Sequence, residues 1–254
     1  MNAEAFIEDG YTIVRRVLGP RERASVAGEL RRFATGLLPV ENPRSRDGRS
    51  DEELLETVLA VNVPHRVSAV VRATIAAPPI RRIAQTLAGA HLPRWDASVQ
   101  HVQSILYNKP PGHPGQPWHQ DEVFMPTRDR SLLGVWIALD ESTIANGCLW
   151  VVPGSHREGF LWPTRLTADE GEHVVSDESF GFDLAAAVAV EVEPGDAVCF
   201  NGYTLHASYR NRAGVARRAL VHHFCSASRS HPCAERPEAP VFLRPFESPC
   251  PAQA

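Results

Sequence analysis

The sequence lacks long apolar runs, since no stretch approaches the roughly 18 consecutive apolar residues that a membrane-spanning helix needs. Residues 1–6 have no basic start followed by an apolar core, so we expect no secretory signal. Neither sign of charge is in excess: the net charge is −4, and acidic and basic residues are interspersed. This argues against a nucleic-acid-binding or membrane-seeking surface. We therefore expect a cytoplasmic protein whose partners include neither nucleic acid nor membrane.

Cysteine is also scarce, with five residues among 254, and no two form a C-x-x-C pair. An odd number without paired spacing argues against both a disulfide framework and a structural zinc site. We expect Cys148, Cys199 and Cys225 to be small buried hydrophobic residues on strands. Cys233 and Cys250 complete the set.

A chain of 254 residues fits one large domain, and we expect a single domain over 1–254. The first hundred residues read as mostly helical, with helical support over about 18–90. A short β-branched strand at 11–17 precedes this part, and the polar segment 39–52 reads as a loop. The expected helices run from Gly19-Pro20 to about residue 36, over 65–76 and over 78–89.

From about residue 98 the pattern changes to short strands punctuated by glycine and proline. A turn at Asn146-Gly147 joins the second of these strands to the third. Such a succession predicts a barrel or a double-sheet jelly roll, so the fold class is mainly β with flanking helices. We expect the core over about 98–226 and a Pro-rich tail over 232–254. The strands are predicted at 99–107, 132–139, 148–152, 188–192, 197–200 and 217–224.

His119-Gln-Asp121 and the distant His206 carry most of the chemical information. A His-x-Asp pair on an extended segment directs both side chains to one face, because side chains alternate along a strand. A second histidine from a remote strand would complete two imidazoles and one carboxylate, the set that holds Fe(II) in non-haem oxygenases with adjacent positions open. A His-x-Asp pair alone is common among surface polar residues, so the weight of this prediction comes from its context.

Arg217 enters a strand eleven residues after His206 and could bind both oxygens of the distal carboxylate of a dicarboxylate. Ser208 shares the strand face of His206 and could add a hydroxyl donor. Arg218 must point to the opposite side, so one of the two arginines is expected to be solvated, and we favour Arg217 as the anchor. The pair His222-His223 alternates along the same strand and reads as one packing and one surface residue.

With these motifs in place, the chain resembles the phytanoyl-CoA dioxygenase family of Fe(II)/2-oxoglutarate-dependent oxygenases from about residue 5 to residue 226. Each motif is weak alone, but their order and spacing together are specific. An N-terminal match, Phe6 to Val14, looks like the opening strand of the family. The other matching segments are Ile105 to Pro111, Trp118 to Asp121, Val135 to Asp140, Asn146 to His156, Pro194 to Asp196, and His206 to Arg217.

The resemblance implies a double-stranded β-helix (a jelly-roll, cupin-like barrel), Fe(II) bound by the two histidines and Asp121, and 2-oxoglutarate bound at Arg217, with O2 as the other co-substrate. It also implies that four further residues line the co-substrate pocket. Trp136 and Ile105 could equally be core residues, and Gln120 could only brace a neighbouring strand. His156 belongs to a rim turn and is not assigned to the metal. The four pocket residues are Trp136, Ser208, Ile105 and Gln120.

The function expected from this resemblance is oxidation of an unactivated C–H bond of a small organic molecule, typically hydroxylation, with release of succinate and CO2. Asp121 argues against a halogenase, because family halogenases carry a small residue there, and no basic patch suggests a CoA thioester. Two alternatives remain: a non-catalytic cupin-like module that binds a metal or small ligand, and a zinc-dependent isomerase or hydrolase on a similar barrel. The candidate substrate contacts, each with a structural reading beside it, are His101, Gln103, Trp118, Phe124 and Trp162.

Overall fold

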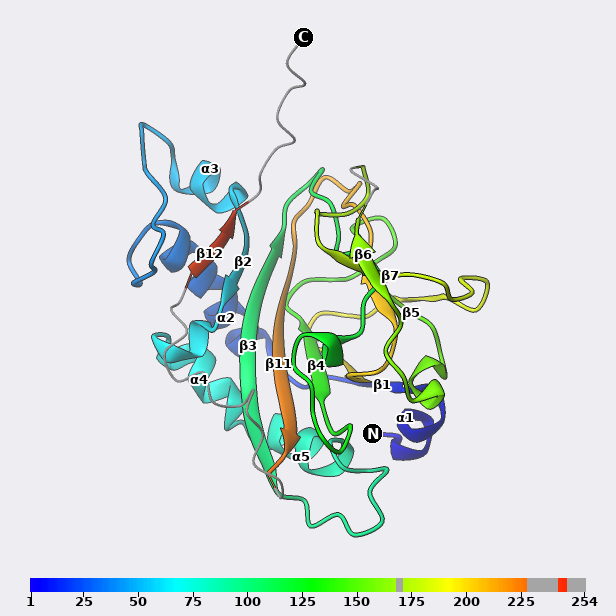
Figure 1. Ribbon diagram of the computed structural model, residues 1–254. Helices are drawn as coiled ribbons and strands as arrows, with labels where there is room; N and C mark the ends of the chain where they lie inside the picture. The colour runs from blue at the N-terminus through cyan, green and yellow to red at the C-terminus, as the bar shows by residue number, and fades with distance from the viewer. Residues whose placement is uncertain (168–170, 228–241, 246–254) are drawn as a thin grey trace.

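The computed structural model describes residues 1–167, 171–227 and 242–245. Its centre is a seven-stranded sheet with the strand order β1-β9-β4-β11-β3-β2-β12, in which every neighbouring pair is antiparallel (Figure 1). The strands in chain order are β1 (Tyr11–Val14), β2 (Val58–Asn62), β3 (Val99–Lys109), β4 (Leu133–Ala138), β9 (Ala197–Asn201), β11 (Arg217–Ser226) and β12 (Phe242–Pro245).

A smaller sheet packs against one face of this large sheet. It contains β5 (Leu149–Val151), β8 (Val188–Val190) and β10 (His206–Ser208) in the order β10-β5-β8. The two sheets share an apolar layer, to which the large sheet contributes Trp136 and Val221 and the small sheet Val151 and Val190. A separate pair, β6 (Thr164–Leu166) and β7 (Asp177–Ser179), lies beside the small sheet (Figure 1).

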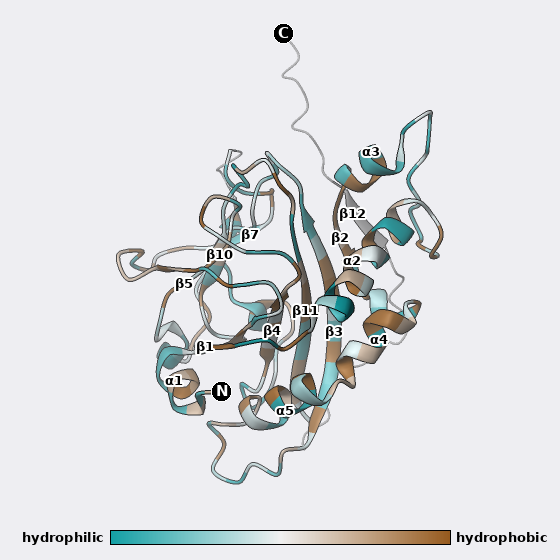
Figure 2. Cartoon of the chain, turned by 180° about the vertical axis from the view of Figure 1, so that it is seen from behind, coloured by the Kyte–Doolittle hydropathy of each residue, from teal (hydrophilic) through white to brown (hydrophobic). Residues whose placement is uncertain are grey.

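Helices cover the other face of the large sheet (Figure 2). The apolar residues Val26, Leu30 and Phe33 recur at helical spacing on α2 and are fully buried, so this helix presents one stripe to the sheet. Proline at the start of α2 and of α5 fixes where each helix begins. The helices are α1 (Ala3–Asp9), α2 (Pro20–Ala34), α3 (Asp51–Glu56), α4 (Ala69–Ile75) and α5 (Pro78–Leu87), with 3₁₀ turns at η1 (Pro64–Arg66), η2 (Asp121–Val123) and η3 (Ser155–Glu158).

The mainly β architecture with flanking helices agrees with the prediction, but several boundaries were wrong. The opening segment is not one strand, because α1 occupies its first part and Gly10, at φ 80°, turns the chain into β1. The predicted strand at 11–17 ends at Val14. The predicted loop at 39–52 gives way to α3 at Asp51, where Ser50 and Glu53 form a capping box.

Two further differences concern strands. The Asn146-Gly147 turn does not close a hairpin, because β4 pairs within the large sheet and β5 within the small one. The chain thus crosses between sheets at this turn, as a jelly roll requires. The strand β2 was not predicted at all, and it extends the large sheet beside β3. Apart from β12, the predicted tail at 232–254 lies outside the described residues.

Cys148, Cys199 and Cys225 are buried, as predicted, and form no disulfide among the described residues. Cys199 and Cys225 lie on β9 and β11, but Cys148 precedes β5 and was wrongly expected on a strand. Cys233 and Cys250 lie outside the described residues. Within the described ranges, no helix has the length and apolar character to cross a membrane.

Candidate active site

Backbone pairing brings the two distant parts of the predicted metal site together. His119 and His206 form an isolated antiparallel bridge, in which each backbone N–H donates to the other carbonyl at 3.0 Å. His206 begins β10, and Asp121 begins the 3₁₀ turn η2 two residues after His119. The prediction of one continuous extended segment therefore fails at Asp121, but the turn still directs its carboxylate toward the histidines.

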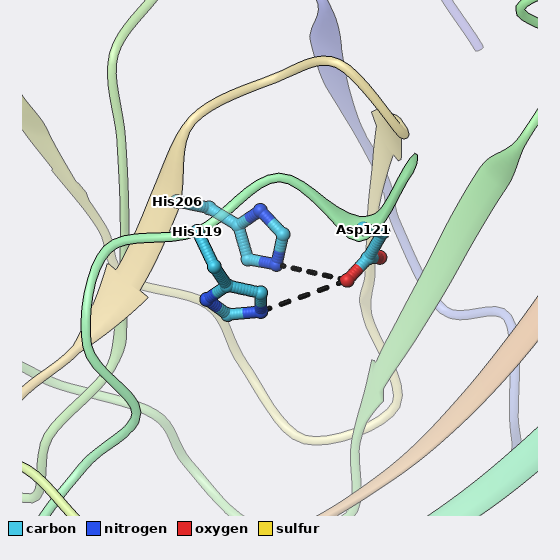
Figure 3. A group of neighbouring side chains, drawn as sticks. All are labelled: His119, Asp121 and His206. Atoms are coloured by element: carbon cyan, nitrogen blue, oxygen red, sulfur yellow. Dashed lines mark ion pairs between the residues drawn. The ribbon is translucent and has the colours of Figure 1, made fainter. Parts of the chain in front are cut away.

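The three side chains converge on one point (Figure 3). Asp121 Oδ1 lies 3.6 Å from His119 Nε2 and 3.7 Å from His206 Nε2. The centroids of the two imidazole rings are 4.1 Å apart, and all three residues are buried. One ligand atom from each residue lies within 4.8 Å of the other two, so a single metal ion could contact all three.

Hydrogen bonds to the backbone fix which imidazole nitrogen faces this point. His119 Nδ1 lies 2.7 Å from the Pro117 carbonyl oxygen, and His206 Nδ1 lies 3.0 Å from that of Thr204. A carbonyl oxygen only accepts, so each Nδ1 must carry the proton and donate it. The Nε2 lone pairs of His119 and His206 are thereby free for a metal, as in most histidine-bound metal sites.

The charges of the site also suit a cation. Burial lowers the pKa of His119 to about 4, so this imidazole is neutral near neutral pH. Burial would raise the pKa of Asp121, but His223 and His206 outweigh it and hold that pKa below its ordinary value. The cluster therefore offers a negative oxygen and neutral nitrogen, the donor set that suits Fe(II) when positions opposite remain open.

His223 is a site residue that the sequence reading missed. It was expected to be a packing or surface residue, but it is buried, and its Nε2 lies 2.9 Å from Asp121 Oδ2. Gln103 Nε2 lies 3.5 Å from His223 Nδ1 and 3.0 Å from Met125 Sδ. The alternation along β11 was the available signal, because His223 lies six residues after Arg217 and hence on the same strand face.

A cavity of about 710 Å³, counted with its open mouth, extends from this cluster into the space between the sheets. Arg217 lines it together with His119, Asp121 and His206. The Arg217 guanidinium is buried: Nη2 donates to the Gly147 carbonyl at 3.0 Å, while Nε has no hydrogen-bond partner. Burial lowers the pKa of Arg217 to about 10, which marks a cation that lacks its counter-ion.

Arg218 has a different environment. Its Nε and Nη2 donate to the two Asp140 oxygens, each at 2.7 Å, on the other side of β11. This pair satisfies Arg218 locally, whereas Arg217 faces the cavity. The two arginines therefore face opposite sides of β11, as alternation along a strand predicts, and the role of Arg217 as the anchor stays a prediction.

The remaining predicted co-substrate residues divide into two groups. Trp136 and Ser208 line the cavity, and the Arg217 guanidinium carbon lies 5.2 Å from the Trp136 ring centroid. Ile105 is partly buried and does not line the cavity. Gln120 does not line it either, because its amide donates to the Tyr203 carbonyl at 2.8 Å and accepts from the Trp162 backbone N–H at 2.8 Å. Its role is to brace two loops.

The predicted substrate contacts are scattered. Gln103 lies beside His223, and the exposed Phe124 ring has its centroid 6.1 Å from that of His119, so both are near the metal cluster. Trp118 is buried in a separate apolar cluster, against which Trp162 packs. His101 is directed away from the cavity, where it contacts the rings of His65, His222 and Phe224. His156 Nε2 donates to the Ile7 carbonyl at 3.0 Å, and this residue does not belong to the cluster of His119, Asp121 and His206.

The sequence model of the phytanoyl-CoA dioxygenase (PhyH) family matches residues 6–219, which is most of the chain. The chain belongs to the phytanoyl-CoA dioxygenase family. Among curated relatives, phytanoyl-CoA dioxygenase 1 of Oryza sativa subsp. japonica is 39% identical over 123 residues, or 48% of this chain and 43% of the rice protein. Phytanoyl-CoA dioxygenase of Arabidopsis thaliana is 33% identical over 123 residues, with the same coverage of 48% and 43%. The match thus spans less than half the length of these relatives.

Solved structures of similar shape cover nearly the whole chain. EvdO2 from Micromonospora carbonacea var. aurantiaca, complexed with 2-oxoglutarate, is 25% identical with a TM-score of 0.62, covering 91% of this chain and 94% of its own. The epimerase SnoN, in complex with Fe3+, alpha ketoglutarate and nogalamycin RO, has a TM-score of 0.67 at 20% identity, covering 97% and 94%. At that identity the likeness concerns the fold alone. Both comparisons confirm the predicted fold class.

Proposed function

We propose that this protein is an Fe(II)- and 2-oxoglutarate-dependent oxygenase that oxidises an unactivated C–H bond of a small organic molecule. One observation carries the proposal: a buried cluster of two histidines and one carboxylate lines the same cavity as a buried arginine that lacks a counter-ion. The reaction balances as substrate C–H, 2-oxoglutarate and O2 giving substrate C–OH, succinate and CO2.

The donor set fits Fe(II). His119 and His206 direct Nε2 toward the site because each Nδ1 is committed to a carbonyl, and Asp121 presents one free oxygen because His223 holds the other. Two nitrogens and one oxygen on one side of an ion leave the other side to a chelating co-substrate and oxygen. When bound there, the iron supplies the activation of O2 and the oxidative decarboxylation of 2-oxoglutarate.

The cavity also fits a dicarboxylate. Arg217 has an unpaired Nε, and planar guanidinium groups bind carboxylates through two parallel hydrogen bonds. EvdO2, which has a similar fold, is a 2-oxoglutarate complex and supports this assignment. Trp136, Phe200 and Val221 line the walls between Arg217 and the triad, so they exclude water and strengthen the electrostatic contacts.

The side chains that line the cavity indicate the general character of the substrate. Apart from Asp121 no carboxylate lines the described cavity, and Leu59, Ala60 and Val174 add apolar surface to it. Gln103 and Phe124 lie beside the metal cluster and are the candidates that contact substrate in this proposal. We propose a compact organic molecule, because the chain offers no basic patch for the phosphates of a CoA thioester.

The deciding experiment reconstitutes the anaerobically purified protein with Fe(II) and measures succinate formed from 2-oxoglutarate in the presence and absence of O2, with a panel of candidate substrates. We expect succinate only with iron and O2, and faster with a true substrate. The Asp121→Ala variant is the matched control and should form none. A binding module would bind 2-oxoglutarate without forming succinate, and a zinc hydrolase or isomerase would turn over without O2; either result contradicts the proposal.

A further inference from the structure

Lys109 is the only lysine among the 26 lysine and arginine residues of the chain. It ends β3, and it is buried with 6% of its surface exposed. It lines the same cavity as Arg217. No carboxylate in the described part of the chain forms an ion pair with either of these cations. Two buried positive charges therefore share one cavity without a protein counter-ion.

The geometry around the Lys109 ammonium explains why arginine could not replace it. Its Nζ lies 2.8 Å from the Tyr209 carbonyl, 2.9 Å from Ser208 Oγ and 3.1 Å from the Gly147 carbonyl. Three acceptors around one nitrogen match the three donors of a compact ammonium group, whereas a guanidinium spreads its donors in a plane. Each of the three protons of Lys109 thus has a partner within the protein.

These contacts determine whether the Ser208 hydroxyl can donate a hydrogen bond to a ligand or accept one from it. Its Oγ accepts from Lys109 and also from the Gln116 backbone N–H at 3.1 Å. A hydroxyl oxygen has two acceptor positions and one proton, so both positions are occupied and only the proton remains. The described residues give that proton no acceptor. Because Ser208 lines the cavity, the proton is available to a ligand beside Arg217.

We propose that Lys109 is a positioning residue of the 2-oxoglutarate subsite: with the Gln116 amide it commits the Ser208 hydroxyl to donate, and with Arg217 it prepares this part of the cavity for the distal carboxylate. The inference rests on the proposed function and deepens it. Burial and the neighbouring Arg217 charge also lower the pKa of Lys109, and a bound anion would offset both effects.

The first test measures 2-oxoglutarate binding by calorimetry to protein loaded with Mn(II), which does not turn over. Lys109→Met and Ser208→Ala should each raise the Kd by roughly tenfold or more, as expected for loss of a hydrogen bond to a charged group. The double variant should bind no more weakly than the worse single variant, because Lys109 acts on the ligand through the Ser208 hydroxyl that the second change removes. Arg218→Met, which removes a cation outside the cavity, should leave the Kd unchanged.

Two outcomes overturn the inference: an unchanged Kd for Lys109→Met, or fully additive losses in the double variant, which would mean that Lys109 does not act through Ser208. A wild-type protein that binds no 2-oxoglutarate instead overturns the proposed function itself.

The second test needs no variant and remains valid if Lys109→Met fails to fold. Protein labelled with ¹³C in lysine carries one labelled side chain, so the Cε signal reports on Lys109 alone. We expect 2-oxoglutarate to shift this signal in protein loaded with diamagnetic Zn(II), while pyruvate, a 2-oxo acid without a distal carboxylate, leaves it in place. If 2-oxoglutarate binds without moving the signal, or if pyruvate moves it equally, the inference is wrong.

Discussion

His223 Nε2 lies 2.9 Å from Asp121 Oδ2, so one carboxylate oxygen is held by the protein and the other, Oδ1, faces His119 and His206. A carboxylate held in this way cannot rotate freely, and it meets a metal through one oxygen. Partners of this kind are usually important for metal affinity, since they orient the ligand and tune its basicity.

We therefore predict that His223→Leu weakens Mn(II) binding by about 10- to 100-fold. The measurement is the concentration of free Mn(II) by electron paramagnetic resonance during a titration. His222→Leu is the matched control, because His222 lies next in sequence but contacts Thr74 and Ser104 on the helix side of the sheet. Equal metal affinity in the two variants would show that His223 does not position Asp121 for the metal.

Arg217 and Arg218 offer a second matched pair. We predict that Arg217→Ala raises the KM for 2-oxoglutarate by about two orders of magnitude, because a bidentate contact between ions is lost, while Mn(II) affinity stays near the wild-type value. Arg218→Ala should leave that KM unchanged, since its partner is Asp140. Steady-state kinetics at varied 2-oxoglutarate decide the matter, and an effect of similar size in both variants would show that the anchor is misassigned.

Much of the candidate site could be predicted, because its metal-binding and cationic residues are of characteristic types and lie at characteristic spacings in the sequence. His119, Asp121 and His206 lie together in the structure, and Arg217 rather than Arg218 faces the cavity. Which arginine faces the cavity depends on the register of β11. Alternation places Arg217 and Arg218 on opposite faces of the strand, but it does not say which face is the inner one. Asp140, the partner of Arg218, shows which arginine faces outward, and it lies 78 residues earlier in the chain, two residues after β4.

Other features depended on local irregularities that spacing does not encode. The pairing of β11 with β3 shifts between His223 and Phe224, so Gln103 pairs with His223 but His101 pairs with Phe224. This bulge rotates His101 to the helix side, although simple alternation places it on the same face as Gln103. The helix-starting capping box at Ser50 and the strand β2 were likewise hidden in polar or short segments.

His101 and its neighbours on the helix side lead to a prediction about pH. Burial lowers the pKa of His101 to about 3 and that of His65 to about 4, and it places the pKa of His222 well below the ordinary value. The unfolded chain takes up protons on these residues near pH 6.5, but the folded protein does so only at much lower pH. The unfolded state thus binds more protons in acid, and stability is lost as the pH falls from about 6.5 toward about 4.

We expect the fully buried His222 alone to contribute up to about 1.4 kcal/mol per pH unit of this loss. Urea unfolding at about pH 7 and about pH 5.5 measures the effect. His222→Leu should show a smaller difference between the two pH values than the wild type. A stability that does not change over this interval would mean that the histidines are already charged in the fold.

The last prediction concerns Gly147, whose carbonyl accepts hydrogen bonds from both Lys109 and Arg217. Its φ is +77°, and a Cβ at this position would meet the Tyr209 carbonyl oxygen at 2.3 Å. Gly147→Ala must therefore strain the backbone and also displace the carbonyl that holds the two cations. Gly36→Ala is the matched control, because Gly36 has the same φ of +77° but open space where the Cβ would lie.

Both variants should lose about 1 kcal/mol of unfolding free energy from the left-handed backbone, and Gly147→Ala should lose more because of the contact with Tyr209. Only Gly147→Ala should also weaken 2-oxoglutarate binding, by roughly tenfold or more if either cation loses its fixed position. Thermal unfolding and calorimetry on the two proteins separate strain from site geometry. A Gly147→Ala protein that binds 2-oxoglutarate as tightly as Gly36→Ala would show that the shared carbonyl does not position Lys109 and Arg217 for the ligand.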